Sequence, residues 1–578
     1  MHDDLKVFFL DPQTPAQRQY EALRAYAMEG LSAQQAAERY GFTENSLYAL
    51  AHDLRVGKLR LFPKRLTGPK DRRLTPYVRD RIAELREQGL SAQDIAQRLE
   101  PEMIVVHARS VERILKEAGF GKLPRRSPAQ RGLTLKNTLA AQPAQNLDMG
   151  KLEPFHEDCQ VAGAFLFLPY ILESGLLDCW DALPMPQSAR IGKRQAGLSF
   201  LLLKLIGGER LCHVRQYDHD VGFGVFAGLN VLPKPSYMGS YSCRVSAALC
   251  QRLQKEMVSR FIQRAPGFCQ GDTLNLDFHA IAHFGEQSHM EKVWCGARNK
   301  AMKGANTFFA QDADTRALVY ANADVLRKDG AEEVLHFAGY WKDVRGVVKE
   351  TLVFDARLTT YGVLGKLDAI PVHFITLRIR NKTLTAQTDA LPPCAWQPVK
   401  LPIPKRKHQE FLAYESEVTL AGCPKPFRQI VIKDHGRLDP TYVITNNRAL
   451  ALTDVLAIYA RRWRIENKLA ELVDFFNLNA LSSPIMARIY FDLLLSVAAS
   501  FLYQQFARDL PRFEHCLAPE IFRQFVDIPG TVKFDGRTFE VRMRKRAHTP
   551  ILLGVKKLAQ PIAVPWLDNR PLRIMWTA

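Results

Sequence analysis

The apolar positions of the first 120 residues recur at helical spacing, and the pattern occurs twice. The segment EGLSAQQAAERYGF (29–42) is similar to QGLSAQDIAQRLEP (88–101). In each copy an amphipathic helix precedes the segment, another helix follows it, and a serine (Ser32 or Ser91) stands where a helix N-cap belongs. This layout is typical of a helix-turn-helix module, with a plain helical bundle as the alternative. The helices are predicted over residues 15–28, 44–55, 75–87 and 108–118.

Residues 151–270 are predicted to be mostly helical. The two most apolar runs of the chain, AGLSFLLLKLIGG (196–208) and LLLSVAASFLY (493–503), are shorter than the roughly 20 residues that span a bilayer, so they predict buried helices and no membrane partner. The segment GFGVFAGLNVLPKP (222–235) lacks the lysine and the strand–helix context of a phosphate loop. We interpret it as a loop that binds no nucleotide.

A strand pattern begins at residue 272. In TLNLDFHAI, apolar side chains alternate with Asn275, Asp277 and His279, which places these three on one face of a strand. The runs NTFFAQ and RALVYANA follow and predict an antiparallel hairpin. The residues DADT between them then explain Asp312 and Asp314 as turn residues rather than site residues.

The next elements alternate between helix and strand. A helix (331–341), an apolar strand that ends at Asp355, a helix (361–368) and a strand (372–379) follow the hairpin. Three antiparallel strands, a helix, a strand, a helix and a strand is the element order of a ribonuclease H-like domain. The β-type segments FLAYESEVTL, RQIVIKD and TYVITNN then interrupt this order before the helical stretch YARRWRIEN (459–467).

We therefore predict an α+β multidomain protein, in which helix-turn-helix modules precede a ribonuclease H-like core with an inserted β-rich subdomain. The predicted parts are a first helix-turn-helix module (1–56), a basic linker (57–74), a second module (75–122), a linker (123–150), a helical region (151–270), the first part of the core (271–379), the β-rich insertion (380–447), the second part of the core (448–510) and a basic C-terminal region (511–578).

The positive net charge of the chain predicts a polyanionic partner. The chain has 578 residues with Lys+Arg 79 against Asp+Glu 60, a net charge of +19, which favours a polyanion: nucleic acid first and an anionic membrane second. Eight basic residues stand against one acidic residue between positions 55 and 73, and six against none between 542 and 557. Such segments contact phosphates rather than bases. The residues predicted to bind DNA in this way are Lys64, Arg65, Arg72, Arg73, Arg125, Arg126, Arg544, Lys545 and Arg546.

The ten cysteines are scattered, without a CxxC pair or a Cys/His cluster at zinc spacing. They are typical of reduced cytosolic thiols, and they make a structural zinc site improbable.

Three acids occupy comparable places in the predicted fold. Asp277 lies on the polar side of the first strand, Asp355 ends the fourth strand, and Glu466 lies on the helix after the insertion. The first and fourth strands are neighbours in a ribonuclease H-like sheet, so we expect the three carboxylates to converge. Converging carboxylates repel one another unless a cation intervenes, and hard oxygen ligands select Mg²⁺, with Mn²⁺ as a substitute. Two such ions would serve phosphodiester chemistry. The alternative is that Glu466 only pairs with Arg462 on a solvated helix face.

The segments LNLDFHAI, LVFDARLTTYG and YARRWRIEN resemble the Asp, Asp and Glu blocks of DDE transposases from bacterial insertion sequences. The similarity is to the group with a β-rich insertion before the Glu and a Tyr-Arg-Glu-Lys signature around it. The resemblance implies that Asp277, Asp355 and Glu466 are catalytic metal ligands and that Tyr459 and Arg462 contact or position DNA. The signature's lysine is expected where this chain has Val473, and Lys468 lies on a different helical face.

The resemblance also implies a partner and a location. The partners would be the terminal inverted repeats of a mobile element and target DNA, bound by a dimer that pairs two ends, in the cytoplasm at a bacterial nucleoid. Trp396 of the insertion is a candidate for stacking on an extruded base, although a core or surface tryptophan is the favoured interpretation. His279 and His283 are expected to support the site rather than to bind metal.

Two other functions share these residues. A ribonuclease H-like nuclease or resolvase would use the same acids and stop after hydrolysis. A transposase-derived DNA-binding regulator would not need the acids, and the presence of all three argues against it.

Overall fold

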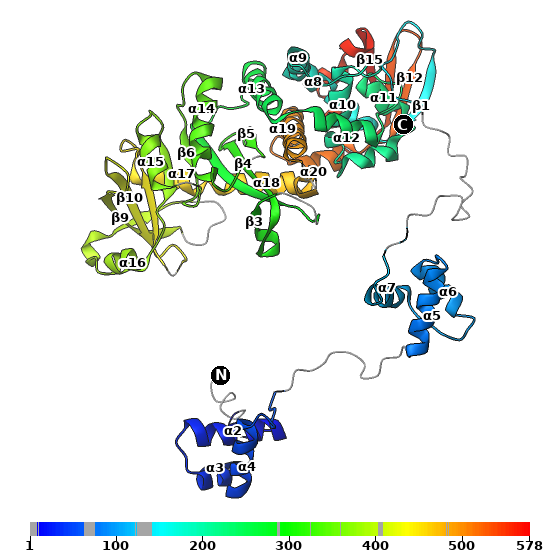
Figure 1. The fold of residues 1–578 in the computed structure, drawn as a ribbon. Helices are drawn as coiled ribbons and strands as arrows, with labels where there is room; N and C mark the ends of the chain where they lie inside the picture. The colour runs from blue at the N-terminus through cyan, green and yellow to red at the C-terminus, as the bar shows by residue number, and fades with distance from the viewer. Residues whose placement is uncertain are drawn as a thin grey trace. The chain divides into compact units, whose positions relative to one another are not determined.

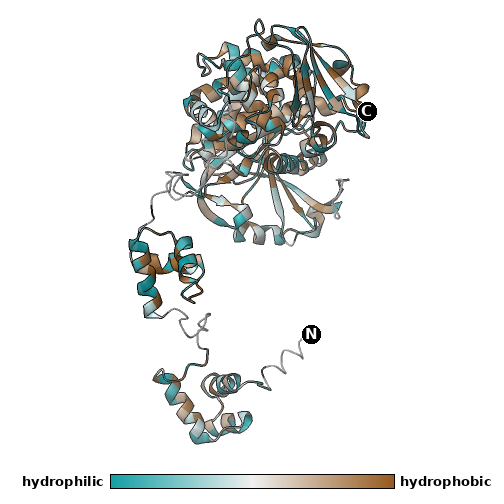
Figure 2. Ribbon diagram, turned by 90° about the vertical axis from the view of Figure 1, so that its right-hand side faces the viewer, coloured by the Kyte–Doolittle hydropathy of each residue, from teal (hydrophilic) through white to brown (hydrophobic). Residues whose placement is uncertain are grey.

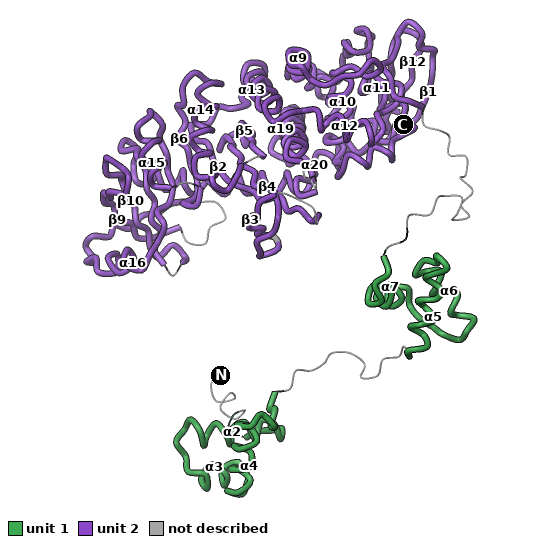
Figure 3. The backbone as a smooth tube through the Cα atoms, in the orientation of Figure 1, with its two compact units in different colours: residues 1–136 green, residues 137–578 purple. Residues whose placement is uncertain are grey.

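The computed structural model describes residues 9, 11–62, 75–121, 123, 142–285, 290–323, 325–358, 360–402, 409–437, 439–480, 483 and 485–577. The chain divides into two compact units, residues 1–136 and 137–578 (Figure 3). Helices and large β-sheets are both present, so the fold is of the predicted α+β class.

The first module of unit 1 has an apolar core of its own. Its three helices are α2 (Pro15–Met28), α3 (Ala33–Tyr40) and α4 (Glu44–Arg55). Ser32 caps α3 through a capping box, as predicted. Gly41 ends α3 at a φ of 71°, a conformation that glycine adopts without strain. Ala22, Ala36 and Leu47 are completely buried between the helices. Figure 2 shows polar and apolar segments alternating along these helices, as expected for helices with one buried face.

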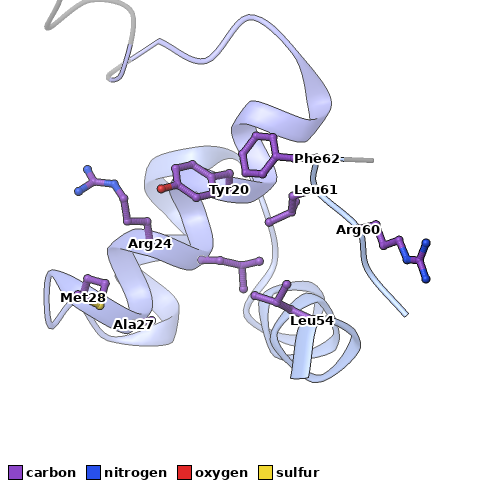
Figure 4. Close-up of a pocket in the computed structure, with 9 residues that line it drawn as sticks. Tyr20, Arg24, Ala27, Met28, Leu54, Arg60, Leu61 and Phe62 are labelled. Atoms are coloured by element: carbon purple, nitrogen blue, oxygen red, sulfur yellow. The ribbon is translucent and has the colours of Figure 1, made fainter. Parts of the chain in front are cut away.

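A pocket of about 700 Å³ lies between α2, the end of α4 and the segment that follows α4 (Figure 4). The rings of Tyr20 and Phe62 meet edge to face at its rim, with 5.3 Å between their centroids. Figure 4 also shows the guanidinium groups of Arg24 and Arg60 directed away from the apolar lining. The pocket therefore extends the apolar core of this module to its surface.

The second module repeats the plan with a separate core. Its helices are α5 (Pro76–Glu87), α6 (Ala92–Leu99) and α7 (Ala108–Glu117). Ser91 caps α6 through a second capping box, so both predicted caps are confirmed. The connection between the second and third helices differs between the copies: it covers residues 41–43 in the first module and 100–107 in the second. Only the first connection has the length of a typical helix-turn-helix turn.

The central sheet of unit 2 is built on β2 (Thr273–Ala282) (Figure 1). β2 pairs antiparallel with one neighbour, β4, and parallel with the other, β6. On the two flanks, β5 pairs antiparallel with β4, and β7 pairs parallel with β6. These strands and the helices between them are β4 (Lys300–Asp312), β5 (Leu318–Asn322), α14 (Glu333–Arg345), β6 (Thr351–Val353), α15 (Tyr361–Asp368) and β7 (Phe374–Leu377). The elements follow one another as predicted, with one added strand, β3 (Lys292–Cys295), between β2 and β4.

The inserted strands continue the central sheet, whereas a separate subdomain was predicted. The strand order runs on from β7 through β11, β10 and β9 to β8, antiparallel at each step. An unpaired edge at β7 would expose a row of backbone donors and acceptors, and β11 covers it. The elements of this part are α16 (Lys382–Asp389), β8 (Gln397–Lys400), β9 (Glu410–Val418), β10 (Phe427–Lys433), β11 (Thr441–Thr445) and α17 (Leu452–Ala460).

A second sheet joins the two ends of unit 2. Strand β1 (Phe155–Cys159) pairs with β12 (Gly530–Phe534), and the order is β1, β12, β13, β15, β14. The predicted helical region and the predicted C-terminal region are therefore one folded body. The remaining strands are β13 (Phe539–Arg544), β14 (Ile562–Val564) and β15 (Arg570–Thr577).

The core of unit 2 is largely helical around α19 (Met486–Arg508), which belongs to the predicted buried runs. By length and composition α19 could cross a membrane, but 83% of its most apolar window is buried inside the fold, which accounts for its composition. Helices α8 (Leu168–Ser174), α10 (Lys193–Leu205), α12 (Pro235–Arg244), α13 (Ala247–Arg264) and α20 (Ala518–Ile521) contact it. Other helices of unit 2 are α9 (Leu176–Ala182), α11 (Val221–Ala227), α18 (Trp463–Asp474), α21 (Thr549–Leu553) and α22 (Lys556–Ala559).

The close approach of Gly163 to the backbone of Val526 provides a test of how the two ends of unit 2 meet. A Cβ on Gly163 would overlap the Val526 carbonyl group, whose backbone cannot move aside as a flexible side chain could. We expect Gly163→Ala to lower the free energy of unfolding by at least about 2 kcal/mol, measured by urea denaturation.

Gly339→Ala is the matched control. Gly339 lies inside α14 with no atom within 4 Å of the position of a new Cβ. Alanine there should be neutral or should stabilise the protein by roughly 0.5–1 kcal/mol, because glycine is the weaker helix former. Equal stability losses in the two variants would contradict the packing described for Gly163.

Candidate active site

Asp277 lies in the middle of β2, on the polar side of the strand as predicted. Its side chain is 20% exposed, and its Oδ1 accepts a hydrogen bond from the Phe278 N–H at 2.9 Å. Two residues earlier on the same face, Asn275 is fully buried and lies opposite Gln311 of β4. Alternate residues share a face of a strand, so Asn275 and Asp277 lie on the same face of β2. This face is buried at Asn275 and becomes accessible to solvent at Asp277.

Asp355 follows the end of β6, beside Asp277. The parallel register of the two strands pairs Asn275 with Val353. Two further residues along each strand bring Asp355 level with Asp277. The Ala356 N–H donates to Asp355 Oδ1 at 2.6 Å, which holds the carboxylate at the point where the chain leaves the sheet.

Glu466 reaches the same place from the first turn of α18, a helix that contacts β2. The link is the guanidinium of Arg462. Its Nη1 donates to Asp277 Oδ2 at 3.2 Å, and its Nη2 donates to Glu466 Oε1 at 2.6 Å. The Arg462 side chain is 18% exposed, whereas that of Glu466 is 54% exposed. The predicted ion pair between Arg462 and Glu466 is therefore present, and Arg462 also forms an ion pair with Asp277.

The stretch YARRWRIEN is not one continuous helix, as was predicted, but two helices with a tight turn between them. α17 ends at Ala460, and α18 begins at Trp463. Backbone hydrogen bonds across the break run from each N–H to the carbonyl three residues earlier, including Arg462 to Tyr459. This spacing stacks residues i and i+3 above one another. Tyr459 and Arg462 consequently lie on the same side of the turn, next to the acids.

The start of α18 is anchored to the turn between β4 and β5. Arg464 Nη1 donates to the Ala313 carbonyl at 2.5 Å and to Asp314 Oδ1 at 3.3 Å. Gln311 Nε2 in turn donates to the Arg464 carbonyl at 3.4 Å. Asp312 is fully buried and accepts three backbone N–H groups within this region, so the prediction that it serves the turn is confirmed. These contacts position the helix that carries Glu466.

Charge and burial act together on Asp277. Burial raises the pKa of Asp277 from 3.8 to about 6, and the nearby charges of Glu466 and Asp355 act in the same direction. The Arg462 guanidinium and the Phe278 N–H oppose this rise. Burial alone would lower the pKa of Arg462, but its interactions with Tyr459 and the three carboxylates outweigh burial and raise that pKa. All three acids therefore lie within electrostatic reach of one guanidinium.

Tyr459 borders this cluster as a neutral phenol. Burial raises its pKa to about 12, although the positive charge of Arg462 opposes the rise. A hydroxyl that keeps its proton at physiological pH is a hydrogen-bond donor.

The donor set at the cluster suits a hard divalent cation, because it consists of carboxylate oxygens. Within the described part of the chain, no group of three or more His, Cys, Asp and Glu side chains stands close enough to hold a metal ion. The cation between Asp277 and Glu466 is the guanidinium of Arg462, so metal binding requires these carboxylates to release it. All ten cysteines are free thiols. His279 Nε2 lies 2.8 Å from Asn479 Oδ1, consistent with the supporting role expected for it.

Comparison of the chain with protein-family models finds no match, and comparison with curated proteins finds none either. Among solved structures, the chain is similar to the piggyBac transposase in a synaptic complex with hairpin DNA. The two chains are 10% identical, the match covers 63% of this chain and 78% of that chain, and the TM-score is 0.33. A similarity this low carries no argument about function. Membership of the bacterial insertion-sequence group stays a prediction.

The basic residues predicted to bind DNA fall into two sets. Arg544, Lys545 and Arg546 are exposed at the end of β13, and no ion pair to another described residue engages their side chains. The others lie outside the described residues: Lys64, Arg65, Arg72, Arg73, Arg125 and Arg126.

Trp396 packs in the core of the insertion, which is the interpretation that the sequence favoured over base stacking. Its side chain is only 8% exposed, with Lys433 Nζ 3.9 Å from the ring centroid and the ring of Tyr414 nearby. The indole has no free face for a base in this arrangement, because the insertion packs as part of the sheet. Lys468 is buried and pairs with Glu471 at 2.5 Å, so it does not replace the lysine expected at Val473.

The raised pKa of Asp277 predicts how the stability of the metal-free protein depends on pH. The folded state holds the Asp277 proton more tightly than the unfolded state does, so this residue makes the protein less stable as pH rises toward and through about 6. Relative to wild type, Asp277→Asn should therefore gain about 1 kcal/mol of stability between pH 5 and pH 7 in the presence of EDTA. Denaturant unfolding at the two pH values measures the difference. A stability difference independent of pH would contradict the environment described for Asp277.

The bridging role of Arg462 predicts a link between this residue and divalent cations. Without metal, Arg462→Gln should destabilise the protein by about 1–2 kcal/mol, because three carboxylates lose their cation. Added Mg²⁺ should raise the melting temperature of Arg462→Gln more than that of wild type, in which Arg462 competes for the carboxylates. Arg461→Gln is the control, since Arg461 is exposed and lies 3.7 Å from Asp314. Equal Mg²⁺ effects on all three proteins would argue against the competition.

Proposed function

We propose that this protein is a DNA transposase that cleaves phosphodiester bonds at the ends of a mobile element and joins the exposed 3′-hydroxyl to target DNA. The observation that carries the proposal is the contact of Arg462 with both Asp277 and Glu466, with Asp355 within electrostatic reach of the same guanidinium. These acids come from two neighbouring strands and a distant helix. Neighbouring carboxylates repel one another, and a bound divalent cation would offset that repulsion.

The order of strands in the central sheet supports the same proposal. A ribonuclease H-like fold requires its first and fourth strands to be neighbours, and β2 and β6 are parallel neighbours here. The first three core strands, β2, β4 and β5, are antiparallel, and the last two, β6 and β7, are parallel. We therefore propose a ribonuclease H-like core, whose central sheet is extended by the inserted strands. The N-terminal modules are proposed to bind DNA as helix-turn-helix modules.

Each residue of the cluster has a role in this proposal. Asp277, Asp355 and Glu466 would hold two Mg²⁺ ions, which when bound supply activation of the attacking hydroxyl and stabilisation of the leaving oxygen. Arg462, released from Glu466, binds a phosphate group, for which a planar guanidinium is well suited. Tyr459 donates its hydroxyl proton in a hydrogen bond to a phosphate oxygen. Because α18 is anchored through Arg464, Glu466 stays in place while Arg462 changes partner.

The proposal predicts that the three acids are needed for chemistry and not for binding. Asp277→Ala, Asp355→Ala and Glu466→Gln should each lower the rate of DNA cleavage by at least about a hundredfold, because each removes several kcal/mol of transition-state stabilisation. The assay incubates the full-length protein with Mg²⁺, DNA that carries the ends of the element and a target plasmid. DNA affinity without Mg²⁺ should stay within about threefold of wild type, since none of these variants removes a basic residue.

Asp343→Ala is the control for this series, because Asp343 is an exposed acid of α14 whose partner is Lys255 at 3.1 Å. Full cleavage activity of the Asp277→Ala variant would contradict the proposed site. DNA binding and biological output that stay unchanged in Asp277→Ala, without DNA cleavage by wild type, would favour a DNA-binding regulator. Cleavage by wild type without any joined product would favour a nuclease or resolvase. EDTA should abolish both steps in wild type.

A further inference from the structure

The strand β3 and the first residues of β4 form a hairpin that continues beyond the end of β2 (Figure 1). β2 pairs with β4 as far as Ala282, opposite Gly304. From there onward β3 takes the place of β2, with Lys292 opposite Lys303 and Trp294 opposite Ala301. The hairpin is thus a rigid extension of the strand pair that carries Asp277.

Two large aromatic side chains, Trp294 of this hairpin and Phe284 just after the end of β2, face the solvent. Trp294 is 61% exposed and Phe284 is 63% exposed, whereas Trp341 and Trp180 are at most 2% exposed. Arg298 lies over the ring of Phe284, with 5.8 Å between its Cζ and the ring centroid. Trp294 therefore contributes little to the core, and most of its side chain is accessible from the solvent.

The same hairpin is basic. Lys292, Arg298, Lys300 and Lys303 belong to it, and Glu291 is the one acid between residues 290 and 304. Glu291 accepts a hydrogen bond from the Arg327 backbone N–H at 2.7 Å, which engages it outside the hairpin. Lys292 and Trp294 share one face, because alternate residues of a strand point to the same side. A cation beside an exposed indole is the combination that binds a nucleotide, through its phosphate and its base.

The distance from the candidate active site is limited by the continuous strand β4. Phe309 lies opposite Asp277, and Ala301 lies opposite Trp294 on the same strand. At about 3.4 Å per residue, these positions are at most about 27 Å apart, the length of roughly eight base pairs of DNA. A DNA strand that is cleaved at Asp277 can therefore reach Trp294 without leaving the protein.

We propose that this hairpin binds unpaired nucleotides of the DNA strand close to the cleavage site, with a base stacked on Trp294 and a phosphate held by Lys292, which lies on the same face. The proposal rests on the proposed function for the location of the cleavage site. Neither the resemblance in sequence nor the cluster of acids assigns a role to residues 290–304. An indole stacks on any base, so the contact places the strand without selecting a sequence.

The experiment measures binding of the full-length protein in EDTA, where no cleavage occurs. One probe is a fluorescent blunt duplex, and the other is the same duplex with a single-stranded oligothymidine tail. Trp294→Ala should weaken binding to the tailed probe by roughly five- to hundredfold and leave the blunt duplex within about twofold. Trp294→Phe should recover most of the loss, because a phenyl ring also stacks. Lys292→Ala should reduce the salt dependence of binding by about one unit of slope.

Two controls remove exposed residues elsewhere in unit 2: Leu553→Ala, at 57% exposure on α21, and Lys342→Ala, on α14. Both should bind the tailed probe like wild type. Wild-type binding of the tailed probe by Trp294→Ala would overturn the proposal, and so would a change in oligomeric state with unchanged DNA binding. A protein that binds tails through Trp294 but never cleaves DNA with Mg²⁺ would contradict the proposed function alone. One that cleaves and joins DNA while Trp294→Ala binds normally would contradict this inference alone.

Discussion

The contact of Arg462 with both Asp277 and Glu466 joins parts of the chain that are 185 residues apart and holds the candidate site together in the absence of metal. An uncompensated carboxylate at a place as enclosed as Asp277 favours its protonated form, as the raised pKa of Asp277 shows. A second and third carboxylate beside it increase that tendency. The guanidinium of Arg462 offsets part of this cost through its direct contacts with Asp277 and Glu466.

The central sheet determines where these acids meet. β2 and β6 bring Asp277 and Asp355 to the same level, and β11 covers the edge that β7 would otherwise expose. The inserted strands extend this sheet away from the acids, and α17 then leads the chain back to α18. A long insertion between the second and third acids is therefore compatible with one compact site, because it lengthens the sheet at the side opposite to β2.

The sequence predicted best what depends on local alternation. The period of two in β2 placed Asp277 on its polar face, and the serines before α3 and α6 marked both caps. Pairing partners between distant strands leave no such pattern, so the continuity of β7 with β11 was missed. The break before Trp463 was also missed, because side-chain contacts of Arg464 with another turn help to hold it. Helix periodicity cannot register such a contact. The four residues of β3 are too few for alternation to identify a strand.

Arg462 and Arg464 lie two residues apart but contact different parts of the protein: Arg464 contacts a turn of the scaffold, and Arg462 contacts the acids of the candidate site. Arg464 contacts a backbone carbonyl and an aspartate of a turn that Asp312 rigidifies from inside, so its partners belong to the scaffold. Arg462 contacts carboxylates, one of which is 54% exposed and open to other cations. An exchange of cations at Glu466 therefore does not require α18 to move. In the proposed function, the contact at Arg464 keeps α18 in place while Arg462 exchanges its carboxylate partners for phosphate, so charge is rearranged at the short helical break without a change of fold.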